Sequence, residues 1–503
     1  MVFGNLLNPP HLKRFLLALL AGSAAIVIYL TAEHFQVIPG TAALDEEAPE
    51  PPALGELSVL VIPEPGDCPD NRSSFLALEA IRQLVRIPEL EVIAPRSALV
   101  PGRSDHETGP ELPVIETAWQ LHITCSARGV GRPAYSASLL ADTANASRWE
   151  TARHYPEDQL QEFIREITQG LSDEFEIGSS SFETRSVMPS AYLDFLHARW
   201  LLHSDMSRAS EAEALLDGVL DSEPGWAAAL ATRAYSRLLQ QGTDPISAGE
   251  QLQAAKTDLD EALQQNPGES DAHLYRSIIA HRFQWDWSAA YEAAVSALEN
   301  APGDAGVLAA ASTAAFTLGR FEEGAQWLHK AIPLDPLVLS HRLKYGLMLE
   351  FSGQPRAAIE AYRELKILDP YYPGVHAYLG RSLIVGDRIK LALPHMEIER
   401  NAFWRKYGTI LALYAMERPE EAGPKFEQFI QQHEHEAAVQ IAEIMAYSGQ
   451  VEEAFGWLDK AVDQRDPGVS ELVGNPLLGN LFDDPRWERL VDELGLTKDP
   501  ASQ

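Results

Sequence analysis

The chain has 503 residues, enough for about three domains of ordinary size. Its 73 acidic residues outnumber 40 basic residues and give a formal net charge of −33. This balance excludes a typical nucleic-acid-binding protein, which needs a basic surface. It fits either a solvated acidic surface or one that attracts cationic partners. The only cysteines are Cys68 and Cys125, too few for a disulfide-stapled scaffold, and no CxxC pair is present for zinc.

The first apolar segment has the length of a membrane span. Residues 15–32, FLLALLAGSAAIVIYLTA, form an uncharged run that is just long enough for a transmembrane helix. Lys13 and Arg14 precede this run, and acidic residues follow it. The positive-inside rule therefore predicts a single-pass inner-membrane protein, with residues 1–14 in the cytoplasm and the bulk of the chain in the periplasm. A cleaved signal peptide is the alternative. The length of the run and the poor cleavage site at its end argue against this alternative.

The next two stretches differ sharply in composition. Residues 33–56 are rich in proline and acid, which predicts an extended tether. Residues 57–177 predict a small α/β domain. Its expected strands are 57–63, 90–96, 120–128, 134–142 and 147–155, and its expected helices are 74–87 (capped by Ser73 or Ser74), 112–119 and 156–175. The strands 120–128 and 134–142 alternate apolar and polar residues, which indicates a half-buried antiparallel pair.

The order of segments in this domain is characteristic. SVLVIP is followed by PELEVIAPRS, WQLHITCSAR, AYSASLLADTANASRWE and PEDQLQEFIREI. In this order the segments resemble the TolB amino-terminal-like domain of bacterial membrane regulators of the winged-helix or cyclase type, where it commonly precedes tetratricopeptide repeats. LEVIAPRS matches the second strand region of that family, whereas SSFLALEAI departs from its usual helix start. The resemblance implies an α/β domain without catalytic residues.

The two cysteines fall in this domain. Cys68 lies in the loop after the first expected strand, and Cys125 lies in a central strand. In an exported domain the pair is expected to form a disulfide that ties the first loop to the sheet. Two free thiols are the alternative.

A polar linker, residues 178–190, is expected to lead into a helical array over residues 191–496. Prolines divide the array at intervals near 34 residues, which is typical of a helical-hairpin solenoid. These marker prolines are Pro224, Pro267, Pro302, Pro336 and Pro370. The first interval, from Pro224 to Pro267, is longer than the others, which predicts a longer turn around Gln240 to Gly249.

Small residues recur twelve and five positions before the marker prolines, where they would let antiparallel helices approach closely. They are Ala212, Ala255, Ala290, Gly324 and Ala358 at the first offset, and Ala262, Ala297 and Ala331 at the second. Gly319 and Gly353 are expected in the turns between paired helices. This pattern resembles the tetratricopeptide repeat best over residues 190–370, and it persists in a degraded form between Gly380 and Gln432. DDPRWERL near the end resembles the segment that caps such arrays.

Motifs of known chemistry are missing from the sequence. It contains no phosphate-binding glycine loop, nucleophile elbow or zinc-protease motif. His433 and His435 are two positions apart and would not share one face of a helix, so no metal or cofactor is expected. Trp285 and Trp287 are expected to pack between hairpins, with an aromatic ligand platform as the alternative.

The sequence thus predicts an α+β multidomain protein with a transmembrane helix, a small α/β domain and a C-terminal all-α solenoid. Its expected function is a non-catalytic scaffold or adaptor that binds a protein or peptide partner on the solenoid surface. The alternative is a sensory module that signals through another membrane protein, since the stretch 1–14 before the span is too short to hold a regulatory domain. An enzyme is the third and least supported class.

Overall fold

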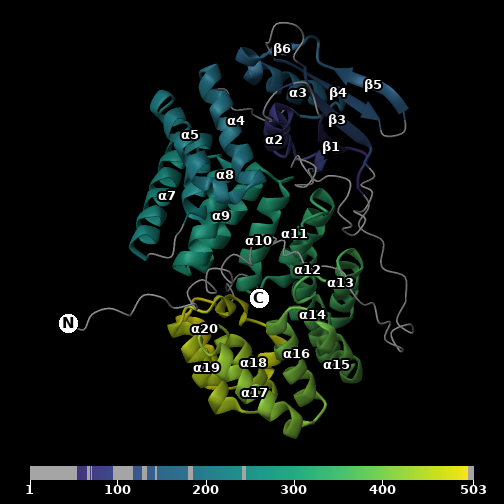
Figure 1. The fold of residues 1–503 in the computed structure, drawn as a ribbon, viewed down its shortest axis with the longest axis vertical. Coiled ribbons are helices and arrows are strands. Elements are labelled where there is room, and N and C mark those ends of the chain that lie inside the picture. The colour runs from purple at the N-terminus through teal and green to yellow at the C-terminus, as the bar shows by residue number, and fades with distance from the viewer. Residues whose placement is uncertain are drawn as a thin grey trace, which may run out of the picture.

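A computed structural model describes residues 54–64, 68, 71–93, 117–126, 133–141, 144–178, 185–240 and 245–496. A mixed sheet with two covering helices lies at one end, and a long helical array forms the rest (Figure 1). The expected membrane span and all but the last residues of the expected tether lie outside the described residues. Within the described part of the chain, no helix combines the length and the apolar character needed to cross a bilayer.

The sheet has the strand order β2-β1-β3-β4-β5, with β6 paired to β4. β1 (Ser58–Pro63) lies parallel to both β2 (Glu91–Ile93) and β3 (Trp119–Ser126). β4 (Ala134–Ala141) lies antiparallel to β3, to β5 (Ala144–Glu150) and to β6 (Tyr155–Pro156). The predicted antiparallel pair is therefore confirmed, with Trp119 opposite Ala141 and Ser126 opposite Ala134.

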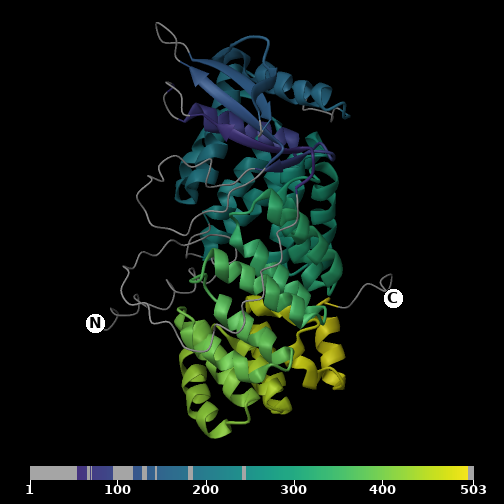
Figure 2. The same cartoon turned by 90° about the vertical axis from the view of Figure 1, so that its right-hand side faces the viewer.

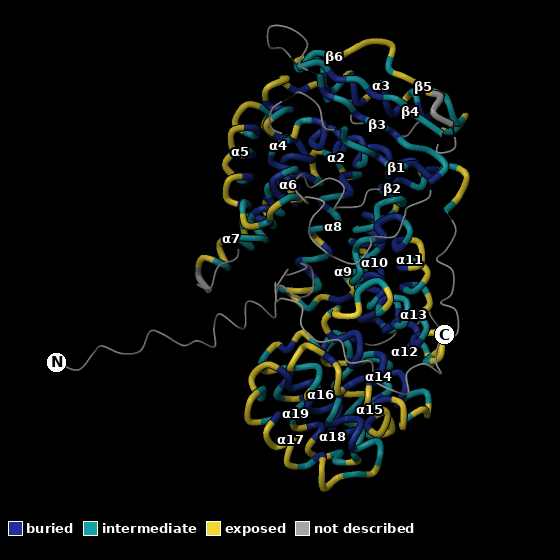
Figure 3. The backbone as a smooth tube through the Cα atoms, turned by 45° about the vertical axis from the view of Figure 1, so that its right-hand side comes forward, coloured by how far each residue is buried: buried dark blue, intermediate teal, exposed yellow. Residues whose placement is uncertain are grey.

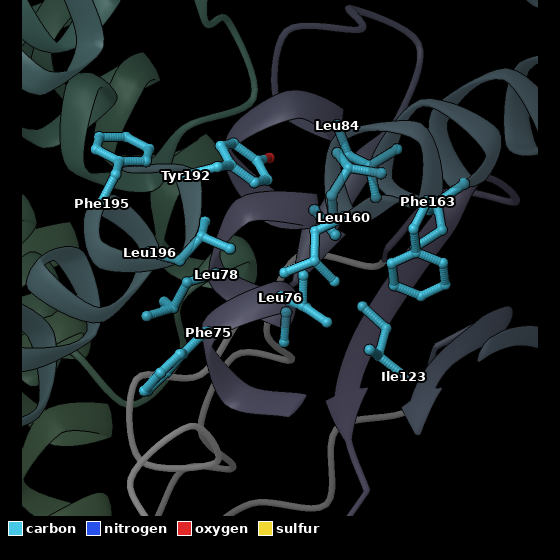
Figure 4. Packing of buried hydrophobic residues seen from close by; sticks show 14 of the residues in the cluster. Phe75, Leu76, Leu78, Leu84, Ile123, Leu160, Phe163, Tyr192, Phe195 and Leu196 are labelled. Carbon is cyan, nitrogen blue, oxygen red and sulfur yellow. The ribbon is translucent and has the colours of Figure 1, made fainter. Parts of the chain in front are cut away.

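Two helices bury one face of this sheet. They are α2 (Arg72–Leu84) and α3 (Leu160–Glu174), the latter preceded by the short 3-10 helix η3 (Glu157–Gln159). The alternation of β3 turns Leu121, Ile123 and Cys125 inward. Leu76 of α2 and Phe163 of α3 lie beside Ile123 (Figure 4). In Figure 2 the sheet runs across one end of the array.

Two local predictions about this unit are wrong. Ser73 and Ser74 do not cap α2, because they are its second and third residues, and both are buried. The Ser73 hydroxyl instead donates a hydrogen bond to the Glu64 carbonyl at 2.9 Å. The residue before α2 is Asn71, in a left-handed conformation (φ 55°) that asparagine tolerates. Trp119 does not end a helix but begins β3, and its indole N–H donates to the Glu56 carbonyl at 3.0 Å.

A disulfide joins Cys68 to Cys125, with Cα atoms 5.8 Å apart. Cys125 points into the core from β3 and is 1% exposed. The bond therefore ties the stretch between β1 and α2 to the centre of the sheet.

Sixteen helices of the described chain, α4 to α19, pair into eight antiparallel hairpins. The first four pairs are α4 (Pro189–Ser204) with α5 (Ala209–Ser222), α6 (Ala227–Leu239) with α7 (Pro245–Gln265), α8 (Ser270–Ile279) with α9 (Trp287–Asn300), and α10 (Ala305–Thr317) with α11 (Phe321–Leu334). The last four are α12 (Leu339–Phe351) with α13 (Pro355–Leu368), α14 (Val375–Val385) with α15 (Ile389–Ile398), α16 (Ala402–Ala415) with α17 (Pro419–His433), and α18 (Ala438–Tyr447) with α19 (Val451–Asp463). A π turn, η5 (Ala280–Gln284), extends α8.

After the last hairpin the chain forms two 3-10 helices, η6 (Pro467–Glu471) and η7 (Pro476–Leu481), and then α20 (Pro485–Glu493). Residues 466–496 are called the C-terminal segment below. Buried positions run through the first helix of each pair, whereas second helices such as α5, α7 and α17 carry exposed faces (Figure 3).

Each marker proline lies two residues after the end of a second helix, in the turn that leads to the next pair. There it cannot continue the helix, because it has no N–H to donate. The eight predicted small residues are all buried where the paired helices meet. A Cβ on Gly324 would lie 2.7 Å from the Met348 sulfur, so a larger residue would require the Met348 side chain to shift.

One expectation about the array needs correction. The long first interval is not only a longer turn, because α7 begins at Pro245 and runs for 21 residues. The stretch from Gly380 to Gln432 keeps the hairpin form, in agreement with the persistence of the sequence pattern there. Its turns place Asp387 (φ 59°) and Glu417 (φ 57°) where other hairpins place Gly319 or Gly353, so the sequence signal is absent although the turn is kept.

The turn at Gly353 provides a test of this geometry. Its φ is +78° and no atom lies within 4 Å of an added Cβ, so Gly353→Ala should destabilise the protein by about 1 kcal/mol through backbone strain alone. Gly218→Ala, in the exposed interior of α5 with equally open surroundings, should instead stabilise it by about 0.5–1 kcal/mol. Urea denaturation of both variants would measure this difference, and shifts of the same sign would contradict it.

The disulfide has a direct chemical test. Intact mass after alkylation should show no modified thiol in the unreduced protein and two after reduction under denaturing conditions. Cys68→Ser with Cys125→Ser should lower the free energy of unfolding by up to about 4 kcal/mol, because the bond closes a long loop with a sequence separation of 57. Two alkylated thiols without reductant would overturn the pairing.

Candidate protein-interaction site

The turns from each second helix to the next first helix stack along one side of the array. Gly225 packs against Gln265, and Gly268 packs against Asn300, so successive turns touch. These turns carry the marker prolines. We call this side the proline edge.

The α/β unit lies along the first half of the proline edge. Arg185, just before α4, donates to the carbonyls of Pro224 at 2.9 Å and Gly225 at 3.0 Å. The Gly303 N–H donates to the Val85 carbonyl at 3.0 Å, and Arg86 lies 3.4 Å from the fully buried Glu269. Three successive turns are therefore occupied by residues from the α/β unit or its connection.

The contact between α2 and the array is apolar at its centre. Figure 4 shows Leu78 of α2 beside Leu196 of α4. The Phe75 ring of α2 stacks on His197 of α4, with ring centroids 5.2 Å apart. Residues of the sheet, of α2 and α3, and of α4 to α6 belong to one buried cluster. The described end of the predicted linker belongs to the same cluster, since Val187 is a member and is only 7% exposed. The α/β unit and the first hairpins thus share a core.

Buried ion pairs rim this contact. Arg82 of α2 pairs with Glu79 at 2.8 Å, and Arg199 of α4 pairs with Asp271 at the start of α8 at 2.8 Å. Burial raises the pKa of the Asp271 carboxyl, but Arg199 and Arg82 outweigh it and hold that pKa below its usual range. A buried pair of this kind fixes geometry more than it stabilises, because both charges lose their hydration.

The cavity beside these ion pairs is small. It lies between α2, α3 and α4, is lined by Glu79, Gln83 and Thr168, and has a volume of about 30 Å³. That is room for about one water molecule. This cavity is therefore no site for a sensed metabolite.

The C-terminal segment folds back over the middle of the array. The Trp287 indole N–H donates to the Leu494 carbonyl at 2.8 Å, and Arg465, just before the segment, donates to the Phe283 carbonyl at 3.1 Å. Gly474 lies so close to Phe321 that an added Cβ would be 2.6 Å from its ring. The segment therefore connects the last hairpin to η5, α9 and α11.

A buried polar network holds this segment to the first helices. Arg381 of α14 lies 2.6 Å from Glu350 of α12 and 3.8 Å from Glu443 of α18, and all three side chains are at most 4% exposed. Tyr407 of α16 donates to Glu443 at 2.7 Å, and Asn475 of the segment donates to its other oxygen at 2.7 Å. Four first helices and the C-terminal segment meet here.

Charge in this network is unbalanced. Burial raises the pKa of Glu471 to about 7, with Glu443 and Asp466 adding to the rise while Arg381 and Lys344 oppose it. Burial likewise raises the pKa of Glu443 above its usual range. The Glu471 carboxyl therefore binds its proton more tightly than an ordinary carboxyl does.

His281 and His395 titrate in the opposite sense to Glu471. Burial lowers the pKa of His281 and of His395 to about 4 in each case. Both rings are neutral at pH 7. Their contribution to stability is present above pH 6.5 and is lost as the pH falls toward 4.

Sequence-predicted aromatic and histidine features have structural roles. Trp287 is 2% exposed, and Trp285 packs beside it with ring centroids 5.7 Å apart and the Arg465 guanidinium 4.7 Å above its ring. The His433 ring packs against the Phe429 ring in a tilted arrangement, with centroids 4.8 Å apart. Among the described residues, no cluster of three or more histidine, cysteine or acidic side chains has a geometry that could hold a metal ion.

Sequence reasoning missed the network residues Glu350, Arg381, Glu443 and Asn475. A signal was present, because each of the first three is a lone charge within an apolar stretch of a first helix: GLMLEF, YLGRSLIV and VQIAEIMAY. A single charge in such a stretch indicates a buried partner. The segment that supplies Asn475 could not be paired with these helices from sequence spacing.

No protein-family model and no curated protein sequence matches the chain. Solved structures with similar helices include one from a study of Pseudomonas aeruginosa pilF, with 18% identity and a TM-score of 0.32, covering 48% of this chain and 98% of that one. A tetratricopeptide repeat protein from Parabacteroides merdae has 14% identity and a TM-score of 0.36, with 48% and 93% covered. Yeast Tom70 has 14% identity and a TM-score of 0.35, with 62% and 69% covered. Because these TM-scores lie below 0.5, the likeness carries no argument about function. The description as a helical-hairpin solenoid rests on the helices of this chain.

Glu471 gives the network a pH signature. Its pKa of about 7 in the folded protein, against an ordinary 4.5, means that the folded state holds this proton more tightly than the unfolded state. The protonated Glu471 carboxyl therefore adds to the free energy of unfolding below about pH 4.5, and this contribution is lost as the pH rises through 7. Glu471→Gln should raise the free energy of unfolding at pH 8 by about 1–3 kcal/mol and leave it unchanged at pH 4.5.

Glu488→Gln, on an exposed position of α20, is the matched control and should have no effect beyond about 0.5 kcal/mol at either pH. Urea denaturation at the two pH values measures both variants. A Glu471→Gln protein that is no more stable than the parent at pH 8 would show that the carboxyl is not held in this network.

Proposed function

We propose that this chain is a non-catalytic scaffold or adaptor, anchored in the inner membrane, that presents a tetratricopeptide-type array to protein partners in the periplasm. The observation that carries the proposal is the array of eight consecutive hairpins. Such an array offers a rigid, extended surface for protein contacts. Its inner helices are stabilised by the chain itself, so the surface is present before a partner arrives.

Support for the location comes from two features. Residues 15–32 form the uncharged run that the positive-inside rule orients with the N-terminus in the cytoplasm. The Cys68–Cys125 disulfide fits an oxidising compartment such as the periplasm.

Support for a regulatory context comes from the α/β unit. Residues 57–177 resemble the TolB amino-terminal-like domain of membrane-tethered regulators in the order of their sequence segments. In this chain the α/β unit shares a buried cluster with the first hairpins, which fixes its orientation relative to them.

Site-specific photocrosslinking of the full chain in membranes tests the scaffold proposal. A photoreactive residue replaces Glu261 of α7, Glu322 of α11 or Glu420 of α17, which are exposed on second helices. At least one position should give a reproducible adduct with another protein. Glu162 of α3, exposed on the α/β unit, is the matched control. Adducts from the control position alone, or from no position, would contradict a scaffold that binds through the array.

A further inference from the structure

Exposed apolar side chains gather on one part of the array. Six large apolar residues of the described chain are strongly exposed, and four of them lie between α13 and the end of α15. These are Ile367 at 64%, Tyr371 at 47%, Leu391 at 39% and Ile398 at 39%. We call this group the apolar patch.

Three of these side chains lie at the proline edge, whereas Leu391 lies near the start of α15. Ile367 is in the last turn of α13, Tyr371 is in the turn that follows, and Ile398 ends α15. The Arg400 guanidinium lies 3.3 Å from the Tyr371 ring centroid and so joins the turns after α13 and α15. Leu391 and Ile398 are seven positions apart on α15 and share one face.

The surroundings of the patch are basic although the chain is strongly acidic. Residues 356–406 contain nine lysine and arginine residues against six acidic residues, a local net charge of +3 in a chain of net charge −33. Several of these cations are exposed near the patch: Arg388, Lys390, Arg400 and Lys406. The natural occupant is therefore a segment that combines acidic and apolar residues.

Other surfaces near the patch are already covered. The α/β unit occupies the first half of the proline edge, and the C-terminal segment covers the middle of the array from η5 to α18. Three of the four patch side chains lie on the part of the edge that continues beyond the α/β unit.

We propose that the acidic tether of this same chain, residues 33–53, docks on the apolar patch. The tether contains five acidic residues: Glu33, Asp45, Glu46, Glu47 and Glu50. No lysine or arginine occurs between Arg14 and Arg72. Apolar residues that fit the patch accompany these charges, namely Phe35, Val37, Ile38 and Leu44.

The point where the tether joins the described chain favours this occupant. The Gly55 N–H donates to Glu91 of β2 at 2.6 Å, and β2 contacts α11. α11 belongs to the hairpin that directly precedes the pair α12 and α13. Two hairpin spacings of about 10 Å each separate α11 from α15, whereas a fully extended tether reaches up to about 70 Å. The tether is thus long enough to cross the patch, and docking would fix the array relative to the anchor that precedes residue 33.

A second copy of the chain is a weaker candidate. It would bring another net charge of −33 against the rest of the acidic surface, and its own patch would bring like positive charge. An anionic membrane would meet the same overall repulsion.

Zero-length crosslinking of the full chain in detergent tests the proposal. A carbodiimide should link the carboxylates of residues 45–50 to the amines of Lys390 and Lys406 within one chain. These links should exceed those to Lys256, on α7 at the other end of the array, by at least fivefold. Ile367→Ser with Ile398→Ser should reduce the Lys390 and Lys406 links at least fivefold, with an unchanged melting temperature because both side chains are exposed.

The matched control is Met188→Ser with Phe482→Ser, which removes two apolar side chains of similar exposure, 47% and 40%, outside the patch. This variant should keep the Lys390 and Lys406 links at the parental yield. The proposal is overturned if the Ile367→Ser, Ile398→Ser variant also keeps the Lys390 and Lys406 links. The links would then come from random encounters of the tether with these lysines and not from docking on the patch. Links that form between chains and rise with protein concentration would assign the patch to a second copy. If amides at the apolar patch are protected from hydrogen exchange only when anionic vesicles are added, the patch binds lipid instead.

Discussion

The contact of Arg381 with Glu350 and Glu443 is the interaction on which the closed form of the array depends. It joins α12, α14 and α18 at one buried point, and Asn475 brings the C-terminal segment to the same carboxylate. Removing one partner from such a network leaves a buried charge without compensation, which costs more than the intact pair contributes. The last four hairpins and the segment are therefore held in one geometry.

This closure changes how the array can be used. An open solenoid offers its inner side to extended partners. Here Val469, Leu472 and Leu478 of the C-terminal segment fill that side with side chains at 0% exposure. The free surface moves to the outer helices and to the proline edge, where the α/β unit already covers the turns at Pro224, Pro267 and Pro302. The proposed scaffold function therefore rests on the outer surface of the array.

Much of the architecture could be predicted from sequence, because it depends on local rules. The period of the prolines follows from helix termination, and the buried Ala212 and Ala358 follow from the close approach of paired helices. Alternation along residues 120–126 identified a strand of the sheet. The turns at Asp387 and Glu417 escaped detection because they use a left-handed residue that is not glycine.

Long-range features could not be predicted in the same way. Arg86 and Glu269 meet at a sequence separation of 183, and Trp287 meets Leu494 at a separation of 207. No periodicity connects such positions, since their proximity results from how the whole array curves. The lone charges within first helices were a usable sign of burial, but they did not identify the partner.

Hydrogen exchange of the full chain tests the closed array most directly. Amides of η6 and η7 in the C-terminal segment should exchange as slowly as those of α14 and α18, at least about a thousandfold slower than in an unfolded chain, because their opening requires loss of the shared core. Exchange of residues 467–481 at the rate of an exposed loop, with α14 and α18 still protected, would show that the segment does not close the array.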